Sequence, residues 1–144
     1  MSLKDGLKKM SKSEISDLSR INLTDDRDQI TNKIKKAKTD TLPLPSTIEE
    51  LEKRPEAENL IGIYSSLTNN TLQKSIDEFA GKNFSEFKEK LSDIVVNEIN
   101  PISLKIKELL DDKDFLEKIL KDGYEKANEI ASKKIKKIHE IVGF

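Results

Sequence analysis

Apolar residues recur at steps of three and four along most of this chain, the spacing that lines one face of an α-helix. Residues from 21 onward follow this rule, whereas the apolar–polar alternation of a half-buried strand is nowhere sustained. Caps and apolar periods together predict five to seven helices, starting near Thr24, Ser46 or Thr47, Pro55, Thr71, Ser85 and Asp114. The last predicted helix runs nearly to Gly143.

Proline and glycine mark the breaks between these helices. Pro43 and Pro45 favour an extended linker at residues 39–45, because proline restricts both itself and the residue before it. Gly81 suits the end of the helix that follows Thr71. Pro101 should kink or restart the long helix without ending the domain, since the apolar period continues beyond it.

The first twenty residues lack any sustained period and are dominated by Lys, Ser and Asp. This composition predicts a flexible loop with at most short helical pieces. The sequence therefore predicts an all-α fold, a helical bundle without a Rossmann sheet. Its expected division is a loop at residues 1–20 and a helical domain at residues 21–144.

Composition narrows the function classes. Of 144 residues, 35% are hydrophobic and 37% are charged, as expected of amphipathic helices with solvated outer faces. The net charge of −1 gives no global attraction to DNA or to a membrane, so any site for a polyanion must be local. The absence of cysteine excludes disulfides and thiolate metal sites and is compatible with a cytoplasmic location. No apolar run is long enough to cross a bilayer.

Several residues that could carry chemistry have simpler interpretations. His139 is the only histidine and is expected at the surface near a helix C-terminus, so no metal site is predicted. The pairs Asp25–Asp26 and Asp111–Asp112 lie where helices should begin, which favours capping. The basic stretch at residues 133–137 is interpreted mainly as a solvated face, with RNA binding as the alternative. Phe79, Phe84 and Phe87 fall on apolar stripes and are predicted to be core, not base-stacking residues.

The segment Lys9-Met10-Ser11-Lys12-Ser13 stands apart from these features. Two ammonium groups and two hydroxyls fall within five residues, in a stretch without an apolar period. Lysine supplies a point charge for phosphate oxygens and serine supplies directional hydrogen bonds. The segment therefore predicts a loop that binds a phosphate-bearing ligand.

The same segment, together with the sequence that follows it, resembles the class I aminoacyl-tRNA synthetases, in particular the bacterial tryptophanyl-tRNA synthetase family. The resemblance continues in order through residues 19–26, 33–40, 54–64, 79–88, 101–102 and 142–144, and so spans essentially the whole chain. Glu14-Ile15 departs from the Asp-Pro that many relatives carry after the signature, which alters the stiffness of the loop.

The resemblance implies an enzyme that activates tryptophan with ATP and Mg²⁺ and transfers it to tRNA(Trp). It implies that Lys9 and Lys12 are catalytic cations, and that Lys9, Met10, Ser11, Lys12 and Ser13 contact the triphosphate. Such cations act by electrostatic stabilisation of the leaving pyrophosphate. Candidate tRNA contacts of the helical domain, which resembles an anticodon-region domain, are Lys33, Lys35, Lys36 and Arg54.

Fewer than ten residues precede the signature, too few for a nucleotide-binding βαβ unit of about thirty residues. We therefore expect the chain to be the C-terminal part of a homodimeric enzyme and inactive alone. The alternatives are part of a tyrosyl-tRNA synthetase, which shares the signature, and a stand-alone helical RNA-binding module. The stretches at residues 22–26 and 36–40 favour tryptophan, and the near-zero net charge disfavours the RNA-binding module.

Overall fold

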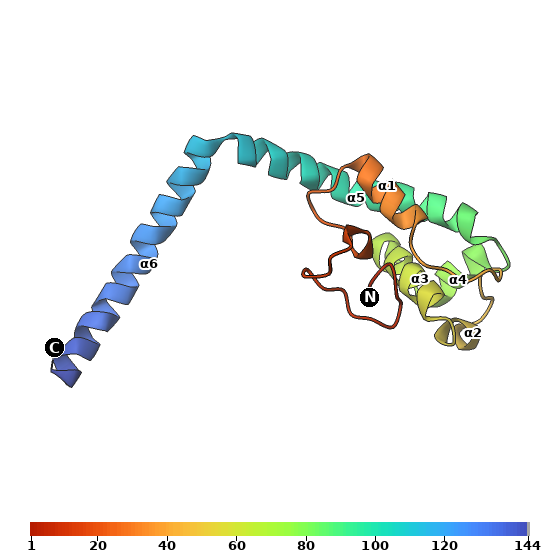
Figure 1. Ribbon diagram of the computed structural model, residues 1–144, viewed down its shortest axis with the longest axis horizontal. Helices are drawn as coiled ribbons and strands as arrows, with labels where there is room; N and C mark the ends of the chain where they lie inside the picture. Colours follow the sequence, from red (N-terminus) through yellow and green to blue (C-terminus); the bar gives the residue numbers. More distant parts are fainter. Residues whose placement is uncertain (144) are drawn as a thin grey trace. The chain divides into compact units, whose positions relative to one another are not determined.

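The computed structural model describes residues 1–143, which belong to two compact units, Met1–Leu104 and Lys105–Phe144. Six α-helices follow a short 3₁₀ turn at Asp17–Ser19 (Figure 1). They are α1 (Arg27–Lys35), α2 (Ile48–Glu52), α3 (Pro55–Thr68), α4 (Leu72–Phe79), α5 (Phe84–Asp111) and α6 (Lys113–Val142). No strand occurs at residues 1–143, where a single isolated bridge joins Ser2 to Asp5. The predicted all-α fold is confirmed.

Side-chain caps explain where most helices begin. Thr47 and Thr71 cap α2 and α4 as predicted, each accepting a hydrogen bond from a backbone N–H three residues on. The prediction that Thr24 caps the first helix was wrong. Asp26 caps α1, because its carboxylate accepts from the N–H of Gln29 while the Gln29 side chain accepts from the N–H of Asp26.

Two other predicted boundaries are resolved by the structure. Pro101 lies inside α5, so this helix does not restart there. Asp112 caps α6 by accepting a hydrogen bond from the N–H of Phe115, as expected for the Asp111–Asp112 pair. Gly143 ends α6 in the left-handed conformation at φ 82°.

The core of the first unit is built on an aromatic cluster. Tyr64 of α3 packs against Phe79 of α4 and Phe87 of α5, with ring centroids 4.8–5.9 Å apart across the three pairs. Aromatic pairs at such separations contribute beyond the area they bury. Fully buried aliphatic side chains surround them, namely Ile30, Ile34, Leu51, Leu60, Ile61, Ile76 and Leu91. Phe79, Phe84 and Phe87 are therefore core residues, as predicted.

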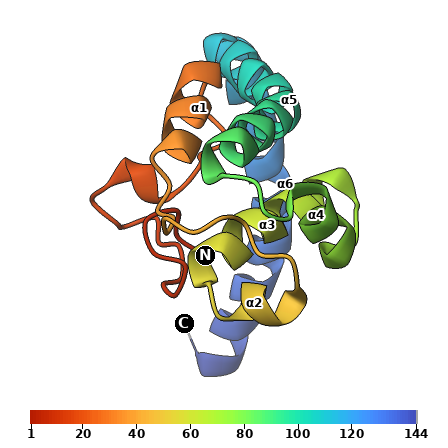
Figure 2. The same cartoon turned by 90° about the vertical axis from the view of Figure 1, so that its right-hand side faces the viewer.

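The three helices α2, α3 and α4 contact one another, and the views in Figures 1 and 2 agree in placing α1 beside α5. A buried ammonium joins the last pair. Lys88 of α5 donates hydrogen bonds to the carbonyl oxygens of Lys35 and Ala37 at 3.2 and 2.6 Å, and to the Thr39 hydroxyl at 3.3 Å. It thereby satisfies carbonyls that the end of α1 leaves without a helical partner. Burial lowers the pKa of this ammonium.

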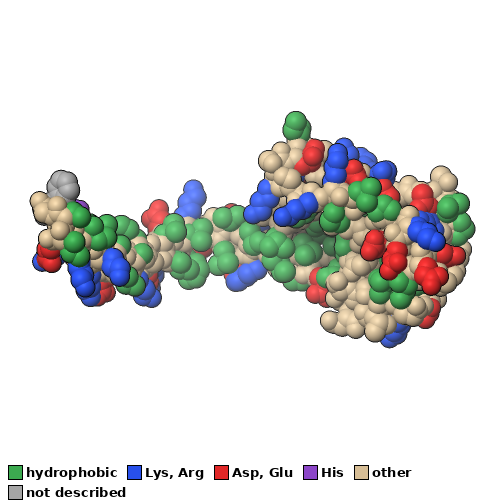
Figure 3. Space-filling model, turned by 90° about the horizontal axis from the view of Figure 1, so that it is seen from below, with side chains coloured by type: hydrophobic (Ala, Val, Ile, Leu, Met, Phe, Trp, Pro, Cys, Tyr) green, Lys and Arg blue, Asp and Glu red, His purple; other side chains and the backbone are tan. Residues whose placement is uncertain are grey.

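In the second unit, α6 has no buried residue. Phe115, Ile119 and Ile135 are about half exposed, Leu120, Ile130 and Ile141 more so, and Figure 3 shows hydrophobic side chains spread along this helix. None of the helices in the described part of the chain is long and apolar enough to span a bilayer.

Candidate functional site: the lysine–serine loop and its anchors

We define the signature loop as residues Lys9–Glu14, an exposed stretch of the N-terminal segment. Inside it, Ser11 Oγ lies 2.8 Å from Ser13 Oγ and accepts a hydrogen bond from the Ser13 N–H at 3.3 Å. The Glu14 N–H donates to the Ser11 carbonyl at 3.4 Å, which closes a turn around Lys12. Within residues 1–143, no carboxylate lies within ion-pair distance of the Lys9 or Lys12 ammonium groups. Both cations are thus available to an anionic ligand.

The segment on the N-terminal side of the loop packs on the first unit. The Leu3 side chain is buried, its N–H donates to the Ser19 carbonyl at 2.9 Å, and its own carbonyl accepts from the Lys38 N–H at 2.7 Å. The 3₁₀ turn at Asp17–Ser19 agrees with the prediction of a loop with at most short helical pieces, but the burial of Ser2, Leu3, Gly6 and Ser19 was not predicted. The mobility of the loop stays a prediction.

The Gly6 backbone lies against the first turn of α3. A Cβ placed on it would lie 2.4 Å from the Pro55 carbonyl oxygen, a distance that no side chain tolerates. Glycine is required here by space, since the backbone of the segment lies directly on the first turn of the helix. This contact fixes the segment three residues before Lys9.

Arg20 holds the other side of the signature loop. Its Nη1 donates to the Glu14 carbonyl at 3.0 Å and, at 3.5 Å, to the Ser11 carbonyl. Its Nε donates to Asn22 Oδ1 at 3.2 Å, and its Nη2 lies 3.1 Å from Asp17 Oδ1. One planar guanidinium thus joins the loop backbone to residues that follow it.

An ion cluster lies beside Arg20, and within it the pair Lys33–Asp25 is buried whereas the Asp17 side chain is 54% exposed. Lys33 of α1 is 3% exposed, and its Nζ lies 2.6 Å from Asp25 Oδ2 and 2.5 Å from Asp17 Oδ2. Asn22 completes the cluster, with its N–H donating to Asp25 at 2.8 Å and its Nδ2 donating to Asp17 at 3.0 Å. The hydrogen bond from Lys33, followed by that from Asn22, lowers the pKa of Asp17. Two cations and two carboxylates leave the cluster neutral.

This cluster bears on two predictions made from the sequence. Asp26 is the helix cap that the Asp25–Asp26 pair predicted, but Asp25 is a buried partner of Lys33, so the capping interpretation of Asp25 was wrong. The Lys33 ammonium is enclosed by carboxylates and offers no cation to an external ligand. Lys35 and Lys36, by contrast, are exposed at the end of α1.

Arg54, the fourth candidate for a tRNA contact, is engaged inside the protein. Its Nε and Nη2 bind the two carboxylate oxygens of Asp40 at 2.8 and 2.6 Å, and its Nη1 donates to the Pro43 carbonyl at 2.6 Å. The guanidinium also lies 5.6 Å from the centre of the Phe84 ring. The hydrogen bond from Arg54 holds the pKa of Asp40 below its ordinary value. This side chain therefore fixes the linker at residues 39–45.

Sequence reasoning missed Arg20, Asp17 and the role of Lys33. One signal was present for Lys33, which lies between Ile30 and Ile34 on the apolar face of α1 and not among its exposed positions. A lysine at such a position needs a buried acceptor. The sequence does not say which of the neighbouring acids supplies it.

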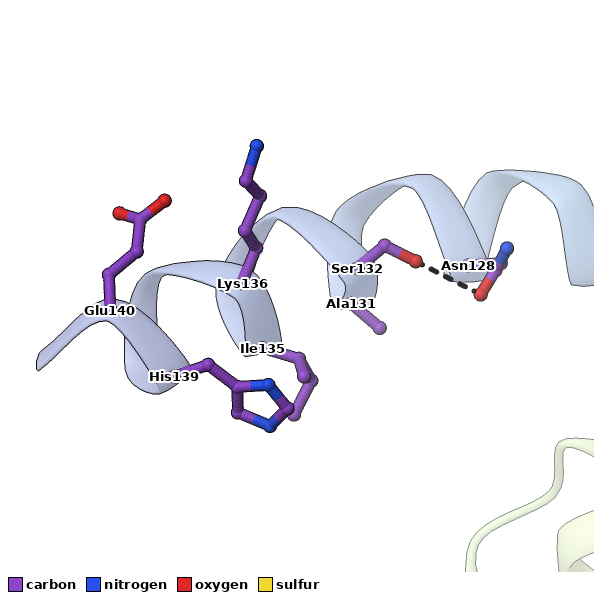
Figure 4. Close-up of a pocket in the computed structure, with 7 residues that line it drawn as sticks. All are labelled: Asn128, Ala131, Ser132, Ile135, Lys136, His139 and Glu140. Carbon is purple, nitrogen blue, oxygen red and sulfur yellow. Dashed lines mark hydrogen bonds between the residues drawn. The ribbon is translucent and has the colours of Figure 1, made fainter. Parts of the chain in front are cut away.

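The surface of α6 forms a shallow pocket whose lining comes from this helix alone, including Ser132, Ile135 and His139 (Figure 4). Ser132 lies within hydrogen-bond distance of Asn128, at 3.2 Å, and His139 is exposed in the last turn, as predicted. No group of three or more potential metal-ligating side chains occurs within residues 1–143. The strongest candidate site is thus the signature loop.

The structure combines an exposed lysine–serine loop with an all-α unit, as predicted from the sequence. Comparison with known families agrees, since the model of the class I tRNA synthetases (W and Y) matches residues 1–100. The chain therefore belongs to the class I tRNA synthetase family that comprises the tryptophan and tyrosine enzymes.

The matched relatives are tryptophan–tRNA ligases. The chain is 52% identical to the tryptophan–tRNA ligase of Agrobacterium fabrum and 51% identical to that of Rickettsia felis, each over 144 residues. Those matches cover all of this chain and 41% and 43% of the relatives. A crystal structure of tryptophanyl-tRNA synthetase from Mycoplasma pneumoniae superposes with a TM-score of 0.73 at 25% identity, covering 100% of this chain and 43% of that one. The chain thus spans about two fifths of the length of these relatives.

Proposed function

We propose that this chain is the signature-loop and helical part of a tryptophan–tRNA ligase, which activates tryptophan with ATP and transfers it to tRNA(Trp). The observation that carries the proposal is the exposed pair Lys9 and Lys12, free of carboxylate partners within residues 1–143, in a chain whose relatives are tryptophan–tRNA ligases. Residues 1–20 belong to the catalytic side and residues 21–144 to the helical, tRNA-binding side.

The proposed chemistry is electrostatic. Lys9 and Lys12, with the hydroxyls of Ser11 and Ser13 and the backbone at Met10, contact the triphosphate while pyrophosphate leaves. Cations that meet charge as it develops lower the barrier without any covalent step. Mg²⁺ is proposed to accompany the triphosphate in the longer enzyme.

The relatives are more than twice as long as this chain, so the complete activity is assigned to a longer enzyme, proposed to be cytoplasmic and a homodimer. The 144 residues alone are proposed to be inactive. Tryptophan-dependent ATP–pyrophosphate exchange by the purified chain, above a blank with host enzyme removed, would contradict this. Exchange supported by tyrosine in the longer enzyme would favour the tyrosyl alternative.

The central experiment is Lys12→Ala in the longer enzyme. We expect the rate of tryptophan activation in single-turnover kinetics to fall by about two to three powers of ten, the scale for one transition-state donor. The affinity for tryptophan should change far less. Lys8→Ala is the matched control, since Lys8 is also exposed and adjacent to the signature. A wild-type rate of tryptophan activation in Lys12→Ala would contradict the proposal.

The proposed tRNA contacts are Lys35 and Lys36, the two candidates whose ammonium groups are exposed. Removing both should weaken tRNA binding by the longer enzyme and reduce the dependence of log affinity on log salt by about one for each phosphate that the protein no longer neutralises. Lys90→Ala, an exposed lysine of α5, serves as the control. An unchanged salt slope would remove both lysines from the interface.

A further inference from the structure

Arg20 is the one side chain outside the signature loop that bonds to the loop backbone in the described part of the chain. The two carbonyls that it contacts, those of Ser11 and Glu14, stand on either side of Lys12 and Ser13. Contacts to both carbonyls restrain the stretch of backbone that carries Lys12.

The other donors of the Arg20 guanidinium, Nη2 and Nε, contact Asp17 and Asn22. Asp17 pairs in turn with Lys33, and Asn22 donates to Asp25, so both contact the buried pair Lys33–Asp25, which we call the anchor of Arg20. Lys33 projects from α1, whose own start is locked by a reciprocal cap. The chain of contacts thus runs without a gap from the loop backbone into a helix of the folded unit.

We propose that Arg20 is a positioning residue of the signature loop, which transmits the placement of α1 to the backbone around Lys12. The effect of Arg20 on activation rests on the function proposed above, whereas its effect on the loop does not. Arginine suits the role because its five donors lie in one plane and can serve carbonyls on one edge and a carboxylate on the other. A lysine at this position could satisfy only part of the set.

The first experiment uses the 144-residue chain and the protease Lys-C, which cuts after lysine. In Arg20→Met, cleavage after Lys9 and Lys12, followed by mass spectrometry, should accelerate at least fivefold. Arg20→Lys should lie between Met and wild type. Arg27→Met, which removes an exposed arginine of α1, should match wild type. Equal cleavage of the Arg20→Met and wild-type loops would overturn the proposal.

A loss of folding is separated from a loss of positioning in two ways. The urea midpoint of each variant is measured, and Asp17→Ala provides a second route to the same outcome, because it removes the link through Asp17 to the anchor and leaves Arg20 in place. Asp17→Ala should also accelerate cleavage after Lys12. Protection of the loop in Asp17→Ala equal to that in wild type would show that the anchor does not hold Arg20, which also overturns the proposal.

The second experiment uses the longer enzyme. Arg20→Met should lower kcat for tryptophan activation about tenfold or more with little change in KM for tryptophan, and Arg20→Lys should restore part of the rate. This split is expected of a residue that acts through Lys12 and not through the tryptophan site. If Lys12→Ala lowers the rate but Arg20→Met does not, the positioning role fails while the proposed function stands. If Lys12→Ala has no effect, the proposed function itself fails, and the cleavage result still decides whether Arg20 holds the loop.

Discussion

Replacing Lys33 by methionine tests the buried pair Lys33–Asp25 directly. The substitution keeps most of the apolar stem of the side chain but removes the ammonium that lies 2.6 Å from Asp25. Asp25 is 4% exposed, so its charge would remain buried without a cation. Breaking a buried pair by removing one partner costs about 3–5 kcal/mol.

The structure places the expected value near the lower end of that range. Asp25 would keep the N–H of Asn22 at 2.8 Å and the Asn22 side-chain amide at 3.3 Å as donors. We therefore expect Lys33→Met to lower the free energy of unfolding by about 3 kcal/mol. With a urea dependence of about 1.5 kcal/mol per molar, the midpoint should fall by about 2 M.

Unfolding should be followed by near-UV circular dichroism, in which the buried Tyr64 reports on the first unit while Tyr124 of α6 is 67% exposed. The far-UV signal would include all of α6. Lys35→Met is the control on the same helix and should stay within about 0.5 kcal/mol of wild type. The double variant Lys33→Met/Asp25→Asn should recover about 2 kcal/mol, since no unpaired charge then remains buried. A loss below about 1 kcal/mol in Lys33→Met, or strict additivity in the double variant, would refute the reasoning.

Two further predictions concern the packing of the N-terminal segment and its charges. Gly6→Ala should destabilise the first unit by about 1–3 kcal/mol, because the new Cβ has no room beside Pro55. Gly62→Ala is the control and should be neutral or stabilising by up to about 1 kcal/mol, since nothing lies within 4 Å of its Cβ. Equal urea midpoints of the two variants would contradict the close approach of Gly6 to Pro55. Acid should weaken the fold through Asp17 and Asp40, whose pKa values are lowered by their cationic partners. A carboxyl group whose pKa is lowered by folding contributes its full stability above its unfolded pKa of 3.8 and loses that contribution as pH falls through its folded pKa. The urea midpoint of Asp40→Asn should therefore depend less on pH below about 4 than that of wild type.

The helices and their core could be predicted from the sequence. Each helix carries its own signals, such as the hydroxyl of Thr47 or Thr71 at its start and apolar residues at steps of three and four. These signals act between residues close in sequence, so a linear reading detects them. The signature loop was predicted for the same reason, since five adjacent residues carry it.

The roles of individual charged residues depended on contacts between distant parts of the chain. Lys33, Lys35 and Lys36 look alike in the sequence, yet one ends in a buried cluster and two at the surface. Arg54 reaches Asp40, fourteen residues earlier, and Arg20 reaches back across the loop that it holds.

The sequence by itself determined the helical periods, some of the caps and the signature that marks the family. Only the tertiary structure decided which cations remain available to a ligand and which hold the fold. The physical reason is that a charged side chain several bonds long finds its partner through the fold and not through its neighbours in sequence. Within residues 1–143 no carboxylate pairs with the Lys12 ammonium, whereas two carboxylates contact that of Lys33.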